Sequence, residues 1–256
     1  MVLQNVNRAQ LALSSDVDQL NNLLVDWAKW DDTYAFITDQ NQNYIKSNLP
    51  PGILSQIRLN MILFINSSGQ LVLGRITDLD TKKEMPVPQN FLKNLFHKGS
   101  LVCHTESDIF NGIVMLPEGP LLISSQPILT SEGKGPVRGT LIMGRYLDSE
   151  LTRLNDTTNL PLVYHRINDS TMPSDFAIAQ SSILGETPTF VKPLSEKSIA
   201  GSALVRDVYG DPALILRIDM PRDIYQQGRA TIYYFALFYS NTPQLAAGMV
   251  MKTNLT

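Results

Sequence analysis

The sequence predicts an α+β protein in which a long N-terminal helix precedes two modules, each containing an antiparallel sheet. Val6, Leu13, Leu20 and Trp27 recur every seven residues, and this spacing is typical of one apolar helix face. Two apolar runs flank a Ser-Ser-Gly turn at 67–69. Two more, at 199–207 and 213–219, flank a turn containing an Asp-Pro step. Both arrangements are typical of β-hairpins.

Length and composition limit the classes of function. A chain of 256 residues with 43% hydrophobic residues is long enough for one large or two modest domains. The net charge of −3 and the lack of a basic run argue against nucleic acid as the main partner. Three His and one Cys are too few and too scattered for a zinc site. We therefore expect no metal and no cofactor.

The leading segment, residues 1–48, carries the densest cluster of unusual residues. Trp27 and Trp30 are the only tryptophans, and Asp31, Asp32 and Tyr34 follow directly. The ring N–H and O–H groups need polar partners when buried, and the aspartates can supply them. Three interpretations remain open: a joint that docks the helix on the next module, a ligand-binding wall, or a surface for a partner helix. Adjacent aspartates on a helix diverge by about 100°, so a catalytic carboxylate pair is not favoured.

The first module is expected at residues 49–159 and the second at 160–220. Patterns in the first predict strands at 59–66, 70–76, 121–129 and 139–146, a helix at 89–97, and a loop at 78–88. Asp148 is expected to cap a short helix that begins near residue 149. Patterns in the second predict a strand at 162–167, a helix at 174–183, an extended segment at 187–193, and the second hairpin. We expect the helices of each module to lie on one side of its sheet.

An outgoing helix is predicted at 221–239. Its apolar end, residues 230–239, is too short to cross a bilayer, which takes about 20 residues, so we interpret it as the start of a transmembrane segment. The alternative is an amphipathic helix that packs in a soluble core. Gly228 weakens this helix and serves either as a hinge or as a point of close packing. Composition changes abruptly at residues 240–256, which we interpret as a vector-derived tail.

Several motifs resemble the fourth type of CHASE domain. They are WAKWDDTY at 27–34, FINxxG at 64–69 and GTLI at 139–142, and the resemblance covers residues 17 to about 159. It implies an extracytoplasmic sensor of archaeal or bacterial receptors, with PAS-like sheets similar to those of Cache sensors. It also implies a place between two membrane helices, upstream of a histidine kinase or a diguanylate cyclase. We interpret residues 160–228 as a second PAS-like module nearer the membrane.

PAS-like modules hold small molecules in the concavity over the sheet, so polar residues on strands are the candidate ligand contacts. In the first module these are Arg75, Ser124, Gln126, Arg145 and Tyr146. Neighbouring strand residues face opposite ways, so Arg145 and Tyr146 cannot both face one pocket. We prefer Arg145, and a guanidinium there predicts a carboxylate-bearing ligand. The alternative for the arginines is a solvent-facing strand end.

Taken together, these features predict the ligand-sensing domain of a membrane histidine kinase, located outside the cytoplasm and not itself an enzyme. No motif for nucleophilic or phosphoryl-transfer catalysis accompanies the histidines. The Val6–Trp27 seam is too long for one small module to cover fully, which predicts parallel homodimerisation through the entry helices in the full receptor. The alternatives are a soluble small-molecule binding protein or enzyme on a similar fold, or the sensor of a diguanylate cyclase.

Overall fold

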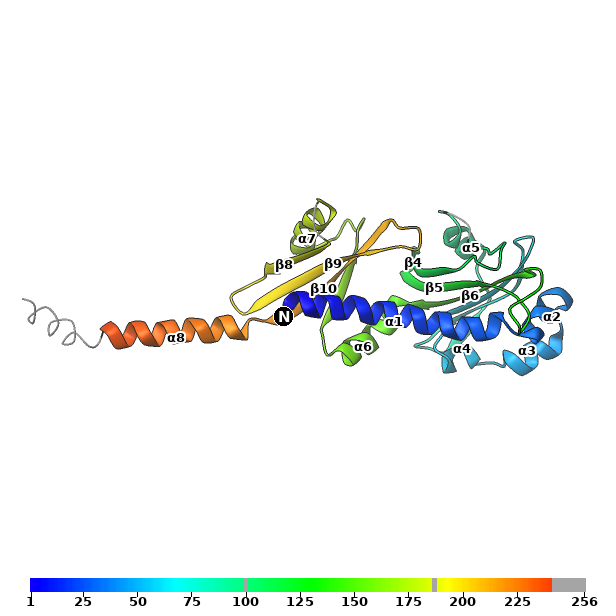
Figure 1. Ribbon diagram of the computed structural model, residues 1–256, viewed down its shortest axis with the longest axis horizontal. Coiled ribbons are helices and arrows are strands. Elements are labelled where there is room, and N and C mark those ends of the chain that lie inside the picture. The colour runs from blue at the N-terminus through cyan, green and yellow to red at the C-terminus, as the bar shows by residue number, and fades with distance from the viewer. Residues whose placement is uncertain (99–100, 186–187, 241–256) are drawn as a thin grey trace, which may run out of the picture.

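The computed structural model describes residues 1–98, 101–185 and 188–240. It is elongated: helix α1 (Val2–Ala28) runs beside two separate sheets, and helix α8 (Asp223–Ser240) extends away from the smaller sheet (Figure 1). Residues 241–256, which we interpreted as part of a vector-derived tail that begins at residue 240, lie outside the described residues.

The sheet farther from α8, here called the distal sheet, has six antiparallel strands in the order β3-β2-β1-β6-β5-β4. Their bounds are β1 (Met61–Asn66), β2 (Leu71–Asp78), β3 (Lys83–Met85), β4 (Phe110–Met115), β5 (Pro120–Pro127) and β6 (Gly139–Tyr146). The predicted β1–β2 hairpin is confirmed. The predicted loop at 78–88 is wrong in part because it contains β3, and β4 was not predicted. Strand β4 is an edge strand with only Ile113 and Val114 buried, so it lacks the alternation that marks a strand.

The sheet next to α8, here called the proximal sheet, has four antiparallel strands in the order β7-β10-β9-β8. Their bounds are β7 (Leu162–Arg166), β8 (Thr189–Pro193), β9 (Ser198–Arg206) and β10 (Pro212–Pro221). The predicted hairpin is confirmed as β9–β10, and the predicted helix at 174–183 is α7 (Ser174–Gly185). The prediction of two antiparallel sheets is therefore confirmed.

Helices lie on both faces of each sheet, so the expectation of one helical side is wrong. The remaining helices are α2 (Asp31–Asp39), α3 (Gln42–Asn48), α4 (Ile53–Gln56), α5 (Gln89–Leu95) and α6 (Leu147–Thr158). Helix α1 packs into one continuous core with residues from both sheets. Helix α5 covers the other face of the distal sheet, and α7 covers the other face of the proximal sheet. Helix α6 begins at Leu147 without a side-chain cap, so Asp148 lies in its first turn and is not the cap.

The apolar seam of α1 is covered within the chain. Val6, Leu13, Leu20 and Leu24 are at most 5% exposed, and burying a leucine contributes about 1.5–3 kcal/mol. Trp27 is half-buried at the end of the same row. The premise that the seam needs a second chain is therefore wrong, because the two sheets together cover it.

The two modules also touch away from α1. The Val208 N–H, in the turn between β9 and β10, donates to the Ile113 carbonyl on β4 at 2.8 Å. In the same turn Asp207 accepts a bond of 2.7 Å from Lys98 Nζ. These contacts tie the tip of the proximal hairpin to the edge strand β4 of the distal sheet.

Candidate functional site

The aromatic and acidic cluster forms the joint between α1, α2 and the loop at 130–138. The Asp31 carboxylate accepts from the Ser131 N–H at 3.0 Å, and the Ser131 hydroxyl accepts from the Asp31 N–H at 3.1 Å. The Tyr34 hydroxyl donates to the Pro136 carbonyl at 3.1 Å, and the Arg138 guanidinium lies over the Tyr34 ring. These contacts hold α2 on the loop at 130–138, with Ser131 in place of a tryptophan as the partner of Asp31, and the role of the cluster stays a prediction.

Beside this joint, α2 and α3 enclose a groove of ≈ 290 Å³, here called the tip groove. It lies at the end of the molecule farthest from α8 (Figure 1). The residues that line it are Trp30, Asp32, Ala35, Phe36, Asp39, Asn41, Asn43, Tyr44, Ser47 and Asn48. Phe36 stacks on Tyr44 with ring centroids 4.4 Å apart, and Trp30 lies 6.2 Å from Tyr44. The groove therefore has an aromatic floor and a polar rim.

Tyr44 forms the rigid part of the floor. The pKa of Tyr44 is raised to about 12, mainly by burial, and the nearby Asp32 carboxylate contributes in the same direction. The hydroxyl of Tyr44 lies 2.7 Å from Thr33 Oγ1, and this hydrogen bond lowers the pKa of Tyr44. Tyr44 is therefore neutral and fixed in place at neutral pH, which leaves recognition to the rim.

The rim offers polar groups that nothing else uses. Within the described part of the chain, the side chains of Asp32, Asn43, Ser47 and Asn48 form no hydrogen bond or ion pair. Sequence reasoning singled out Asp32 but missed the residues on α3, because that helix has only seven residues. Asn41 was the available signal, since its side chain accepts from the Asn43 N–H at 2.8 Å and caps α3.

Two of the predicted ligand contacts lie beneath α1. Gln126 Nε2 donates to Asn21 Oδ1 at 2.7 Å, and the Ser124 hydroxyl lies 3.1 Å from the same oxygen. Ser124 also lies 2.6 Å from Asn111 Oδ1. Both side chains are at most 2% exposed, and together they hold Asn21 of α1 against β5.

The two arginines serve neighbouring backbone segments. Arg75 Nη1 donates to the Leu49 carbonyl at 2.7 Å and lies 3.3 Å from Glu84. Arg145 is buried, and it donates to the carbonyls of Arg58 at 2.7 Å and Ile57 at 3.3 Å. Burial lowers the pKa of Arg145 below its usual value. Neither arginine lines the groove at α2 and α3 or the groove at Tyr146.

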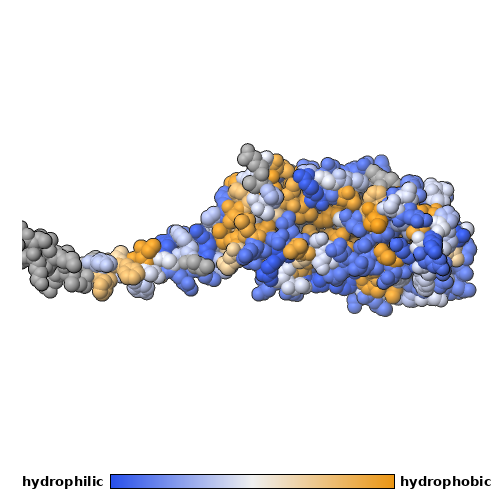
Figure 2. All heavy atoms as spheres, in the orientation of Figure 1, coloured by the Kyte–Doolittle hydropathy of each residue, from blue (hydrophilic) through white to orange (hydrophobic). Residues whose placement is uncertain are grey.

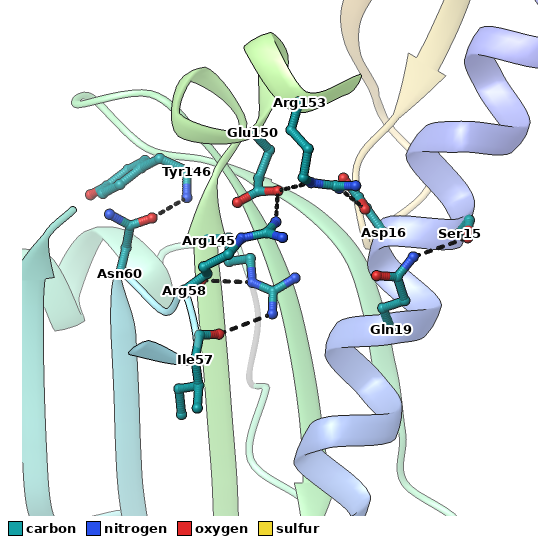
Figure 3. A network of polar contacts seen from close by, with 10 residues as sticks. All are labelled: Ser15, Asp16, Gln19, Ile57, Arg58, Asn60, Arg145, Tyr146, Glu150 and Arg153. Atoms are coloured by element: carbon teal, nitrogen blue, oxygen red, sulfur yellow. Dashed lines mark hydrogen bonds and ion pairs between the residues drawn. The ribbon is translucent and has the colours of Figure 1, made fainter. Parts of the chain in front are cut away.

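Arg145 borders a network of charged side chains that links α1, α6 and the end of α4 (Figure 3). Arg153 of α6 pairs with Asp16 of α1 and, at 2.8 Å, with Glu150. Glu150 also pairs with Arg58. The side chains of Asp16 and Glu150 are 1% and 2% exposed. Sequence reasoning missed this network, although Asp16 interrupts the apolar row between Leu13 and Leu20.

Tyr146 lies on the opposite face of the distal sheet, as strand alternation predicted. Its N–H donates to Asn60 Oδ1 at 2.9 Å. Its ring lines a groove of ≈ 340 Å³, the lining of which includes the four carboxylates Asp78, Asp80, Glu118 and Asp148. Burial and the Glu118 charge raise the pKa of Tyr146 to about 12. The five predicted contacts therefore do not line one concavity.

Most of the described side chains of helix α8 are exposed. A Cβ added at Gly228 would have no neighbour within 4 Å, so nothing in the described chain packs closely there. The exposed large apolar side chains toward its end are Ile232, Tyr233, Tyr234, Phe235, Leu237, Phe238 and Tyr239. In Figure 2 this helix is hydrophilic next to the sheet and carries hydrophobic residues among paler ones farther out. Among the described helices, none combines the length and the hydropathy that a bilayer span requires.

The described residues contain no candidate metal-binding site. Within them, no three His, Cys, Asp or Glu side chains are grouped so that they could hold an ion. Cys103 is buried as a free thiol, and burial raises the pKa of its thiol. Its N–H donates to Thr140 Oγ1 at 2.8 Å, which gives this segment a packing role.

Comparisons with known proteins agree with this geometry. A family model described as the CHASE4 domain matches residues 12–165. The methanogenesis regulatory histidine kinase FilI of Methanothrix harundinacea is 34% identical over 235 residues, which is 90% of this chain. The chain spans 25% of the length of that relative.

Two solved sensor domains share the fold. The extracellular domain of the putative histidine kinase vpHK1S-Z8 aligns with a TM-score of 0.57 at 12% identity, over 88% of this chain and 95% of that one. The periplasmic domain of Vibrio cholerae LuxQ aligns with a TM-score of 0.53 at 12% identity, over 87% of this chain and all of that one (100%).

The family match covers more than half of the chain and includes the whole distal sheet, the joint and the tip groove. The observed sheets, with a long helix beside both, agree with the PAS-like arrangement that the motifs implied. The chain belongs to the CHASE4 domain family, and it is similar to the extracellular domains of sensor histidine kinases.

Proposed function

We propose that this chain is the extracytoplasmic sensory part of a membrane-anchored histidine kinase, and that it passes the binding of a small molecule to α8. The observation that carries the proposal is the connection between β10 and α8. Strand β10 ends at Pro221 and α8 begins at Asp223, so only Arg222 lies between them. A displacement of the proximal sheet therefore reaches α8 with almost no slack.

The first turn of α8 is also fixed to the proximal sheet. The Arg222 N–H donates to the Lys197 carbonyl at 2.9 Å, and Arg222 Nη1 donates to the Ser195 carbonyl at 3.1 Å. Gln226 Nε2 donates to the Glu196 carbonyl at 2.5 Å. These bonds hold α8 to the turn between β8 and β9, which supports movement of the sheet and the helix as one body.

The tip groove is the proposed stimulus site. Its volume suits a compact molecule, and its rim carries Asp32 and Asp39 without any lysine, arginine or histidine in the lining. This charge favours a neutral or cationic ligand in place of the expected carboxylate. Ser124, Gln126, Arg75 and Arg145 are proposed to hold α1 and the α4 segment on the distal sheet, so that a change at the tip is passed along α1.

The homodimer of the full receptor is proposed to form through α8. The seam of α1 is occupied by the two sheets, whereas Ile232, Phe235 and Tyr239 are 61–75% exposed on the outgoing helix. They follow a spacing of three and four residues, which places them on one helix face. Cysteines at Ile232 and Phe235 should cross-link in receptor-containing membranes, and cysteines at Leu13 and Val17 should not.

A covalent probe tests the stimulus site without a known ligand. Cys103 is buried, so a cysteine introduced on the rim by Asn43→Cys is the reactive thiol for a bulky maleimide. Labelling should change autophosphorylation of the full receptor in membranes. The control is Asn22→Cys, which is exposed on α1 and does not line the groove. Equal activity of both labelled variants would exclude the tip groove as the stimulus site.

A further inference from the structure

A groove of ≈ 370 Å³ lies where α1 passes from one sheet to the other, and we call it the inter-module groove. Its walls come from α1, from β4 of the distal sheet and from β9 of the proximal sheet. The lining residues are Gln10, Leu13, Ser14, Val17, Asp18, Asn111, Gly112, Ile113, Leu204, Val205 and Arg206. Neither the tip groove nor the groove at Tyr146 has walls from both sheets.

The floor of this groove is apolar and its rim is charged. Leu13 and Ile113 are at most 5% exposed, and Val17 and Leu204 are half-buried beside them. This composition provides contact for an aliphatic group about the size of a branched side chain. Asp18 and Arg206 lie exposed on the rim, on opposite walls of α1 and β9.

The rim charges are not neutralised by the protein. Within the described residues the side chain of Asp18 forms no hydrogen bond or ion pair, and neither do the side chains of Gln10 and Ser14. Arg206 uses Nη1 for the Gly210 carbonyl at 2.8 Å and forms no ion pair with a described residue. A carboxylate and most of a guanidinium fork therefore remain available, one on each side of an apolar floor.

We propose that the inter-module groove binds a small zwitterion with an apolar body, the chemical class of an aliphatic α-amino acid. Arg206 receives the carboxylate through charge-assisted hydrogen bonds, for which guanidinium geometry is well suited. Asp18 receives the ammonium group, and the aliphatic body lies over Leu13 and Ile113. A ligand with one charge would leave the opposite rim charge without a partner, so the groove selects against it.

Binding here would bias the arrangement of the two modules. A ligand that contacts α1, β4 and β9 together stabilises the arrangement in which all three walls are close. The Val208–Ile113 bond joins the same two sheets beside the groove. This regulatory consequence rests on the proposed sensory function, whereas the binding itself does not.

The test uses L-leucine and two analogues that each lack one charge: 4-methylpentanoate, without the amine, and 3-methylbutan-1-amine, without the carboxylate. Calorimetric titration of the chain should detect L-leucine, with both analogues at least about tenfold weaker, because one charge-assisted bond contributes about 1.5–3 kcal/mol. Asp18→Asn and Arg206→Gln should each weaken L-leucine about tenfold or more. Both positions are exposed, so the variants should fold.

The matched control is Asp26→Asn, which removes an exposed carboxylate from the same helix outside the groove. It should bind L-leucine like the unchanged chain. Failure of L-leucine to bind at millimolar concentration, or equal binding by all three variants, would overturn the proposal. Binding with the expected variant pattern, but without a response of receptor autophosphorylation, would support the site and overturn only its proposed regulatory consequence, whereas the sensory function is tested separately at the tip groove.

Discussion

Replacing Arg153 by methionine should destabilise the protein by separating α6 from α1. Arg153 is the one partner of Asp16 among the described residues, and it also pairs with Glu150. The variant leaves the Asp16 carboxylate 1% exposed without a counter-charge, while Glu150 keeps Arg58. The flexible methionine preserves most of the apolar packing of the arginine stem.

The expected magnitude follows from the burial of the partners. Removing one member of a buried pair costs about 3–5 kcal/mol. Arg153 itself is 31% exposed, and solvent screening lowers the figure to about 2–3 kcal/mol. For a chain of this length about 2–4 °C of melting temperature corresponds to each kcal/mol, so Tm should fall by roughly 4–12 °C.

The assay is urea unfolding of four proteins: unchanged, Arg153→Met, Asp16→Asn and the double variant. Because Asp16 and Arg153 are in contact, their effects should be less than additive by about 1–3 kcal/mol. The control is Arg8→Met, since exposed Arg8 bonds to the Thr158 carbonyl at 3.0 Å and links the same two helices; its effect should stay near 0.5 kcal/mol, roughly. A loss below about 0.5 kcal/mol for Arg153→Met, or strict additivity, would refute the reasoning.

Three further predictions concern packing and the module contact. Leu20→Ala should lower the free energy of unfolding in urea by about 2–5 kcal/mol. Leu11→Ala should lower it very little, because Leu11 on the same helix is 60% exposed. Gly139→Ala should prevent stable folding, seen as loss of a cooperative transition, because the new Cβ would lie 2.2 Å from the Ile65 carbonyl oxygen; Gly185→Ala, with no neighbour within 4 Å, is the control. Hydrogen bonds to Asp207 and Asp211 raise the pKa of Lys98. The stability that charged Lys98 contributes is therefore fully present below the usual lysine pKa of about 10.4, and it is lost as pH rises through the higher pKa of the folded state. Amide exchange at 207–211 should therefore exceed the intrinsic pH effect as pH rises through the folded-state pKa of Lys98, and Lys98→Met should remove that excess.

Strand alternation predicted which residues share a face, and the structure agrees. Leu141 and Met143, at alternate positions from Arg145 on β6, lie in the core that includes α1, and Arg145 contacts the carbonyls of Ile57 and Arg58. The error concerned what covers that face. A sequence pattern identifies a polar residue on an apolar strand. It does not show whether a ligand or a neighbouring helix provides the hydrogen-bond partner of that residue. Here Asn21 of α1 meets Ser124 and Gln126.

The tip groove shows the same limit at short range. The joint was predictable because Trp27, Trp30 and Tyr34 bury large rings that need a docking surface. The rim on α3 was not, because a helix of seven residues gives too few turns for a periodic pattern. The length of the α1 seam was visible in the sequence, but its two-sheet cover depends on contacts with strands as distant in the chain as β10.

Direct coupling through α8 is the central claim, and one measurement tests it. A Gly-Ser pair is inserted after Arg222, between β10 and α8, in the full receptor carrying Asn43→Cys. Insertion after Asp219 is avoided because that residue pairs with Ala200 inside the sheet. Maleimide labelling at the tip should proceed as before, while the response of autophosphorylation to the label should be lost. A response of normal amplitude in the insertion variant would contradict coupling through this helix.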